Sequence, residues 1–457
     1  MNPILLEKSD SNILINKRSN SNRTPDEIKR ELDKALKDGF NTFYGGSFLL
    51  IPYLLHLGIV ENISALKVEK SSGIPIEKAV LALLHLSIVG KKRISRVENV
   101  TDQGLAVFAG LSKMPDPSFF HDFLDKVKTS DAEQFNILCS RRFKEMGLFK
   151  GKIVNLDRHF MGYFGKKRIG KDKHPTRNIS MKGVNASFTH DQETGDPIFV
   201  RADYPGLRPE DVAIPMLNTT TDIIGDEMEM AVFDKWFSAG SLLDYVNREM
   251  EIKYVTLLKL FQNRIEEMKS IPADQFREMA DGRKITFIHT SLRNYQGEAK
   301  LIVIWFQEDG EDKYYGYLTN DEESPEERTV TIYGKRWRIE NFLKETSFLN
   351  IDKLPGIELN KISAMLAIKL VGYCTVSCLR RDIGGDYAKV EIEGIFEKFL
   401  NIQAFVRSKG EKIHVTYYRY PSELVPLFQD LNEKLKNRGI NPVVPWLNNK
   451  TLEFHFK

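Results

Sequence analysis

Two short apolar runs, each ending in an aspartate, set the tightest limit on how this chain folds. GKIVNLDRHF (151–160) places Asp157 after a β-branched run, and EMEMAVFDKWF (227–237) places Asp234 in the same way. Runs of this kind are typical of buried strands. A carboxylate beside a buried strand is costly unless a hydrogen bond, a cation or a metal ion compensates it. The simpler alternative is that each aspartate is only a turn residue or a helix cap.

The segments around these runs predict a mixed α/β sheet. After the first run, ISMKGVNASFTH (179–190) and DPIFVRADY (196–204) are strand-like and are separated by the turn-forming ETGD. After the second run, residues 238–250 predict a helix and residues 253–260 a buried strand. Three successive strands followed by strand–helix–strand indicate an α/β domain.

The following segment is β-rich. Charged turns separate three strand-like runs, at 284–292, 299–307 and 313–320. The helical period returns in YGKRWRIENFLKETSFL (333–349) and in the strongly apolar residues 360–381, which we expect in the interior.

The two ends of the chain have a different character. The first 24 residues are polar, and we expect them to form a flexible arm. Residues 25–149 predict helices, with Thr24 as the first N-cap. Within this region the helix at 76–89 precedes four cations and is the most DNA-like feature, although a helical dimerisation or packing domain fits nearly as well. These cations are Lys91, Lys92, Arg93 and Arg96. The tail has strand-like runs at 412–420 and 452–457.

Composition excludes several classes of protein. Hydrophobic residues make up 42% of the 457 residues, so the whole chain is not disordered. The net charge is only +3, so any surface for nucleic acid must be local. Three cysteines cannot form a disulfide framework, which favours a reducing, cytoplasmic location. The apolar stretch at 48–60 is interrupted by Pro52 and His56, so we expect a buried helix there and no membrane association.

A third acid has a distinctive context. Tyr333, Arg336 and Glu340 are spaced by three and four residues and share one face of the predicted helix at 333–349. The stretch YGKRWRIENFLKE resembles the DDE transposases of bacterial insertion sequences, in the branch with the signature Tyr-x2-Arg-x3-Glu-x6-Lys. Ser347 stands where that signature has its lysine, and Lys344 could supply a charge one turn earlier.

The resemblance implies a fold and a division of the chain. It implies an α/β, ribonuclease-H-like mixed five-stranded sheet with a β-rich insertion, preceded by a helical N-terminal domain. The first acid lies on the first strand, the second after the fourth strand and the glutamate on the last helix. The expected parts are a flexible arm (1–24), a helical DNA-binding domain (25–149), the catalytic domain (150–261 and 332–385), the insertion (262–331) and a C-terminal α/β tail (386–457).

The resemblance also implies the chemistry. Asp157, Asp234 and Glu340 would bind two Mg²⁺ ions, for which Mn²⁺ substitutes, and would cleave DNA at element ends before strand transfer into target DNA. Three carboxylates suit hard cations, which prefer oxygen ligands. Asp226 and Asp244 are the main rivals of Asp234. The expected partners are the terminal inverted repeats, target DNA and a second copy of the chain, in a homodimer or larger synaptic assembly associated with the nucleoid.

A basic segment follows the first acid. KKRIGKDKHPTR (166–177) holds six Lys or Arg residues and one Asp. A solvated surface loop is the simpler interpretation, but beside a nuclease-type site we expect phosphate contacts. The expected DNA-binding residues are Tyr333, Arg336, Lys344, Lys166, Lys167, Arg168, Lys171, Lys173 and Arg177. For Arg336, a salt bridge to Glu340 or to another acid is the alternative.

Other residues rank lower, and other functions stay open. His159 could touch substrate or simply pack, and Trp236 and Trp337 could stack on a base or fill the rim. Cys374 and Cys378 are best explained as core thiols. The alternative functions are a metal-dependent nuclease of the same fold without strand transfer, and a catalytically silent DNA-binding descendant.

Overall fold

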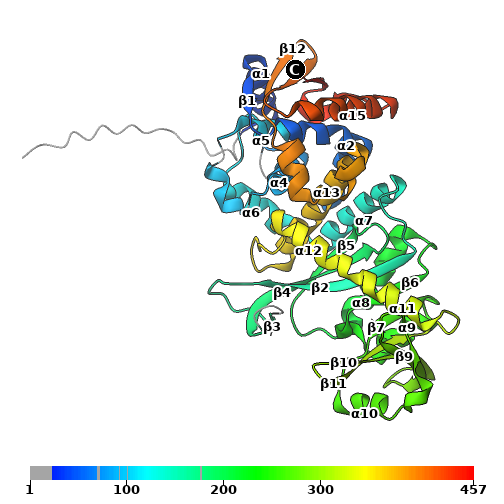
Figure 1. Cartoon of the computed structure of the whole chain (residues 1–457). Helices are drawn as coiled ribbons and strands as arrows, with labels where there is room; N and C mark the ends of the chain where they lie inside the picture. The colour runs from blue at the N-terminus through cyan, green and yellow to red at the C-terminus, as the bar shows by residue number, and fades with distance from the viewer. Residues whose placement is uncertain (1–22, 69–72, 92, 100, 175–177, 457) are drawn as a thin grey trace, which may run out of the picture.

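The computed structural model describes residues 23–68, 73–91, 93–99, 101–174 and 178–456, and Figure 1 shows their arrangement. The expected arm at 1–24 lies outside the described residues except for Arg23 and Thr24. Thr24 caps the first helix as predicted, because its hydroxyl accepts from the Glu27 backbone N–H at 3.2 Å.

A mixed sheet forms the centre of the chain. Five of its strands run in the spatial order β5–β4–β2–β6–β7, with β2, β6 and β7 parallel and β4 antiparallel to both β2 and β5. This is the mixed sheet predicted from the sequence. Its strands are β2 (Ile153–Gly162), β4 (Ser180–Asp191), β5 (Pro197–Asp203), β6 (Met230–Phe233) and β7 (Lys253–Leu257).

The segment expected to be an insertion (262–331) continues this sheet. Strand β11 pairs antiparallel with β7, and β10, β9 and β8 follow outward, so that the sheet reaches ten strands when β3 is included. The three strands predicted in this segment are present. The added strands are β3 (Lys171–Lys173), β8 (Arg277–Glu278), β9 (Lys284–Ser291), β10 (Glu298–Glu308) and β11 (Glu311–Thr319).

Helices cover both faces of the sheet. Helices α7, α8 and α13 pack on β5, while α11 packs on β7, β9 and β11. Successive side chains of β6 point to opposite faces of the sheet. Val232 packs in the cluster that contains Tyr333, and Phe233 packs in the main core. The helices of this part are α8 (Pro209–Ile224), α9 (Gly240–Arg248), α10 (Gln262–Lys269), α11 (Glu326–Gly334), α12 (Arg338–Phe348) and α13 (Leu359–Ile383).

The N-terminal helices and the C-terminal tail form one further body. Strand β1 pairs antiparallel with β12 and is one edge of a five-stranded sheet in the order β1–β12–β13–β15–β14. Helix α13 packs against both α4 and α7 and so joins this body to the central sheet. The elements are α1 (Pro25–Asp38), β1 (Phe40–Thr42), α2 (Ile51–His56), α3 (Ile59–Asn62), α4 (Ile76–Ile88), α5 (Gln103–Phe108), α6 (Pro117–Lys126), α7 (Thr129–Glu145), α14 (Ile392–Ile395), β12 (Ala404–Lys409), β13 (Lys412–Tyr417), α15 (Val425–Asn437), β14 (Val443–Val444) and β15 (Lys450–Phe456).

The two apolar segments noted in the sequence are interior. Helix α13 is long and apolar enough to cross a membrane, but 94% of its apolar window is buried inside the structure. The stretch at 48–60 forms short buried turns of helix, with Ile51, Tyr53 and Leu54 fully enclosed. Both segments are therefore core elements.

The contact between the N-terminal helices and the tail leaves no room for a side chain at Gly46. A Cβ added there would lie 1.8 Å from the carbonyl oxygen of Phe399. We expect Gly46→Ala to lower the free energy of unfolding by about 3 kcal/mol or more, as overpacking against backbone does. Gly334→Ala is the control, because no atom lies within 4 Å of its added Cβ. Equal melting temperatures for the two variants would contradict this packing.

Candidate active site

Asp157 and Asp234 are brought side by side by the pairing of β2 with β6. In this parallel pair Leu156 lies opposite Phe233, and each aspartate immediately follows one of these two residues. Asp157 lies within β2, and Asp234 is the first residue after β6. The strand expected over 227–237 ends early, at Phe233. Asp234 then caps a short 3₁₀ turn, accepting from the Trp236 backbone N–H at 3.4 Å. The capping role that was the simpler alternative is therefore present, but beside a second carboxylate.

Arg336 connects the third acid to this pair. Its Nη1 lies 2.9 Å from Asp157 Oδ2, and its Nη2 lies 3.6 Å from Glu340 Oε1. The side chains of Arg336 and Asp157 are only 15% and 16% exposed, whereas that of Glu340 is 61% exposed. Arg336 lies in the 3₁₀ turn Lys335–Trp337 that joins α11 to α12, and Glu340 lies in the first turn of α12. The ion-pair alternative considered for Arg336 is therefore observed.

The electrostatics are those of a carboxylate cluster with one compensating cation. Burial, together with the charges of Asp234 and Glu340, raises the pKa of Asp157 to about 6, although the charge of Arg336 opposes this rise. Burial alone would lower the pKa of the Arg336 guanidinium, but Tyr333, Asp157 and Asp234 outweigh it and the pKa is raised. The site therefore has an excess of negative charge that favours a further cation.

The donor set fits a hard divalent cation. Asp157, Asp234 and Glu340 offer only carboxylate oxygens, which are the ligands that Mg²⁺ and Mn²⁺ prefer. Among the described residues, these three acids do not form a group whose ligand atoms all lie within 4.8 Å of one another. Glu340 is instead joined to Asp157 through the arginine. A bound cation would thus take over the charge compensation that Arg336 provides.

Tyr333 is buried next to Arg336. Its side chain is only 8% exposed and packs edge-on against Tyr317, with ring centroids 5.4 Å apart. Arg336 lies 5.5 Å from the centre of the Tyr333 ring. Burial raises the pKa of the tyrosine hydroxyl to about 12, so it stays protonated. The structure thus places Tyr333 as a support for Arg336.

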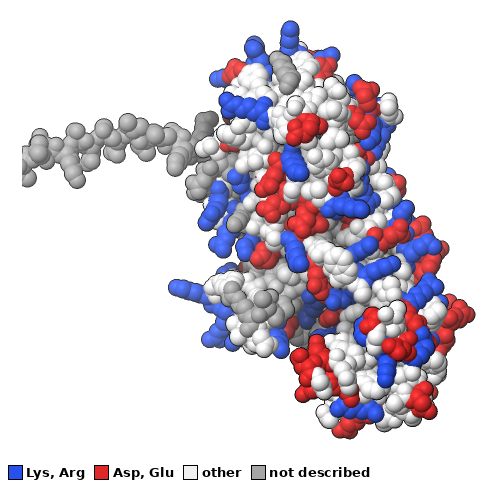
Figure 2. Space-filling model, viewed as in Figure 1, with Lys and Arg blue, Asp and Glu red and all other residues white. Residues whose placement is uncertain are grey.

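The predicted cations are at the surface. Lys166, Lys167, Arg168, Lys171 and Lys173 are exposed on the β2–β4 connection, and Lys167 pairs with Glu358 at 3.2 Å. Lys344 and Ser347 are exposed on α12. Arg177 and Lys92 lie outside the described residues. In Figure 2, Lys and Arg side chains gather at the left margin, on either side of the indentation between the N-terminal helices and the β3–β4 hairpin.

A cavity of about 760 Å³ joins the two basic segments that the sequence analysis singled out. Lys91 and Arg93 line it from the N-terminal region, and Tyr163 and His174 from the β2–β4 connection. His159 also lines it, and it lies two residues after Asp157, on the same face of β2. The cavity therefore lies next to the carboxylates along that strand.

Sequence reasoning missed two lysines of this cavity. Lys369 lies on α13, is 4% exposed and lines the cavity, and burial lowers its pKa to about 7. Its ammonium donates to the carbonyl oxygen of Asn350. A lone cation inside the apolar run AMLAIKLVGY was the available signal. Lys353, in the loop before α13, is the second and carried no such signal.

The lower-ranked candidates lie elsewhere or serve packing. Asp226 is exposed before β6, and Asp244 accepts from the Gln296 backbone N–H at 2.8 Å. Trp236 stacks under the guanidinium of Arg158 at 4.3 Å, and Trp337 is 54% exposed. Cys374 and Cys378 are buried, as expected of core thiols, and Cys139 is buried as well.

Comparison with known proteins identifies the domain to which this fold and carboxylate site belong. Residues 149–375 match the family model of the transposase DDE domain, and this part of the chain is therefore a transposase DDE domain. A solved structure of the piggyBac transposase synaptic complex with hairpin DNA is 12% identical, with a TM-score of 0.46 over 93% of this chain and 84% of that chain. A comparison with curated proteins gave no match.

The raised pKa of Asp157 leads to a prediction about stability. Its ordinary value of 3.8 rises to about 6 in the folded protein, so the stability it contributes while protonated is lost as the pH rises through about 6. In metal-free buffer, the melting temperature of Asp157→Asn minus that of wild type should therefore increase between about pH 4 and pH 6 and then level off. The exposed Asp226→Asn is the control. A difference that stays constant over this range would show that Asp157 titrates normally.

Proposed function

We propose that this DDE transposase cuts DNA at the terminal inverted repeats of an insertion sequence and joins the freed 3′ ends to target DNA. The observation that carries the proposal is the meeting of Asp157 and Asp234 on neighbouring parallel strands, with Glu340 linked to them through Arg336. Asp157, Asp234 and Glu340 would hold two Mg²⁺ ions, replaceable by Mn²⁺. When bound, the ions would activate the attacking water or 3′-hydroxyl and stabilise the leaving oxygen.

Arg336 acts on the scissile phosphate in this proposal. Its guanidinium is partly buried and contacts Asp157, and its two Nη atoms face two different carboxylates. A guanidinium binds phosphate in the same bidentate manner as carboxylate, so Arg336 can exchange one partner for the other without leaving the site. Tyr333 would then act on DNA through Arg336, because its own ring is buried.

The DNA path follows the two basic segments. Lys91 and Arg93 line the cavity that also contains His159, and Lys166, Lys167 and Arg168 are exposed directly after Gly165, which lines it as well. Backbone phosphates bind to such surfaces by neutralisation and counterion release. Residues 25–149 would thus share DNA binding with the catalytic domain. Lys344, Lys171, Lys173 and Arg177 would add further phosphate contacts, and two copies of the chain would hold the paired ends at the nucleoid.

The catalytic proposal is tested with a duplex that carries the inverted repeats flanking the gene. Asp157→Asn, Asp234→Asn and Glu340→Gln should each lower the cleavage rate by about a hundredfold or more, because each removes one charged oxygen ligand. Binding of the duplex should be retained. Asp226→Asn and Asp244→Asn are the matched controls and should cleave normally. Normal cleavage by Asp234→Asn together with its loss in Asp226→Asn would reassign the second acid.

The same assay separates transposition from simple hydrolysis. A pre-cut end with a free 3′-hydroxyl is offered together with a target plasmid, and covalently joined product is measured on a denaturing gel. A transposase joins the end, whereas a nuclease of the same fold only hydrolyses DNA. A silent descendant would bind the duplex and do neither.

The DNA path is tested by the salt dependence of binding in the full chain. The triple variant Lys166→Ala, Lys167→Ala, Arg168→Ala should bind more weakly and reduce the slope of log affinity against log salt by about three. The triple variant Lys29→Ala, Lys34→Ala, Lys37→Ala removes the same charge from exposed positions on α1. An equal loss in both triple variants would mean that only net charge matters.

A further inference from the structure

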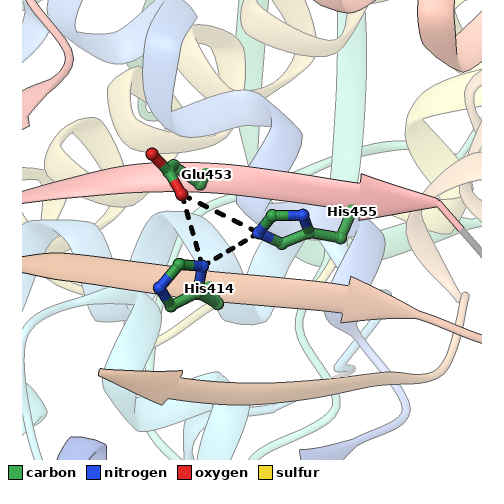
Figure 3. Close-up of side chains that lie close together, drawn as sticks. All are labelled: His414, Glu453 and His455. Atoms are coloured by element: carbon green, nitrogen blue, oxygen red, sulfur yellow. Dashed lines mark hydrogen bonds and ion pairs between the residues drawn. The ribbon is translucent and has the colours of Figure 1, made fainter. Parts of the chain in front are cut away.

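A compact group of ligand-type side chains lies on the C-terminal sheet, on elements that do not contribute to the carboxylate site. His414 is on β13, and Glu453 and His455 are on the neighbouring strand β15 (Figure 3). The two strands are parallel, and His414 lies opposite Glu453 in the register. His455 follows Glu453 by two residues, so all three side chains project from the same face of the sheet. The group therefore follows from strand register and alternation.

The spacing of the three ligand atoms suits a tetrahedral metal ion. His414 Nδ1 lies 2.9 Å from His455 Nε2 and 3.3 Å from Glu453 Oε2, and His455 Nε2 lies 3.9 Å from the same oxygen. Bonds of about 2.0–2.1 Å at tetrahedral angles place ligand atoms about 3.3–3.4 Å apart. The three observed distances bracket this value, so an ion could bind with small side-chain shifts.

The surroundings hold the ligands in place. Lys412 pairs with the other oxygen of Glu453, Oε1, at 2.5 Å, which leaves Oε2 directed at the two imidazoles. Partners of this kind orient metal ligands in proteins. On the opposite face of β13, Ile413 and Val415 are fully buried, so the strand that carries His414 is anchored in the core. The His455 side chain is 43% exposed, which leaves one side of the group open to solvent.

We propose that His414, Glu453 and His455 form a Zn²⁺ site with a water at the fourth position. Two imidazole nitrogens and one carboxylate suit Zn²⁺ and not Mg²⁺, which prefers oxygen ligands. Among the described residues, this is the only group of three such side chains whose ligand atoms lie within 4.8 Å of one another. The ion would connect β13 to β15 and stabilise the sheet that also contains β1.

The test compares metals on the full-length protein after removal of metal by a chelator. Wild type should bind one Zn²⁺ per chain at this site, and its melting temperature should rise as Zn²⁺ is added, because a ligand that binds only the folded state stabilises it. Binding should persist in Asp157→Asn, and Mg²⁺ should not compete for it. With Co²⁺ as the probe, the visible spectrum should be that of a tetrahedral ion with nitrogen ligands.

Variants of the ligands decide the outcome. His414→Ala and His455→Ala should each lose this one equivalent of Zn²⁺ and the associated rise in melting temperature. Glu453→Gln keeps the side-chain shape and should also weaken binding, and its melt without metal shows whether folding is intact. His289→Ala is the matched control, because His289 lies 3.3 Å from Glu322 but belongs to no group of three metal-ligand side chains among the described residues. The proposal fails if wild type binds no Zn²⁺, or if His414→Ala and His455→Ala bind it as wild type does.

Discussion

The parallel pairing of β2 with β6 is the contact on which the active site depends. Because Leu156 lies opposite Phe233, the strand pairing brings Asp157, within β2, next to Asp234, the first residue after β6. A shift of the register by one residue would turn one aspartate to the other face of the sheet. The apolar residues that hold the register, such as Val154 and Val232, are fully buried and thus fix the position of the acids.

In the absence of a bound cation, Arg336 compensates the negative charge of the acids. Two adjacent carboxylates in a half-buried site repel each other, and removing either from water is costly. The guanidinium lies between Asp157 and Glu340 and is itself enclosed by Tyr333. The residue that we propose to bind phosphate is thus also the residue that keeps the acids together, and both roles use the same two Nη atoms.

Much of the catalytic sheet could be predicted from the sequence, because β-branched runs and turn residues mark its strands directly. The three strands at 284–292, 299–307 and 313–320 were also predicted, because charged turns separate them. The pairing of β11 with β7 was not predicted, because strand neighbours depend on long-range contacts. Helix α8 was not predicted from the sequence pattern. The pairing of β1 with β12 and the burial of Lys369 had no local pattern that specified a partner. Sequence spacing placed Arg336 and Glu340 on one face, but only the structure showed that Arg336 contacts Asp157.

The pairing of Phe40 with Val406 has a consequence for how the protein is made. Nearly the whole chain must leave the ribosome before β1 can pair with β12. At a synthesis rate of about 5–20 residues per second, this takes tens of seconds. During that time the N-terminal helices have an unpaired strand edge and uncovered apolar surface. Such an interval favours chaperone binding or early contacts with a neighbouring nascent chain. The rate at which active enzyme accumulates would then depend on how well the cell protects this incomplete intermediate.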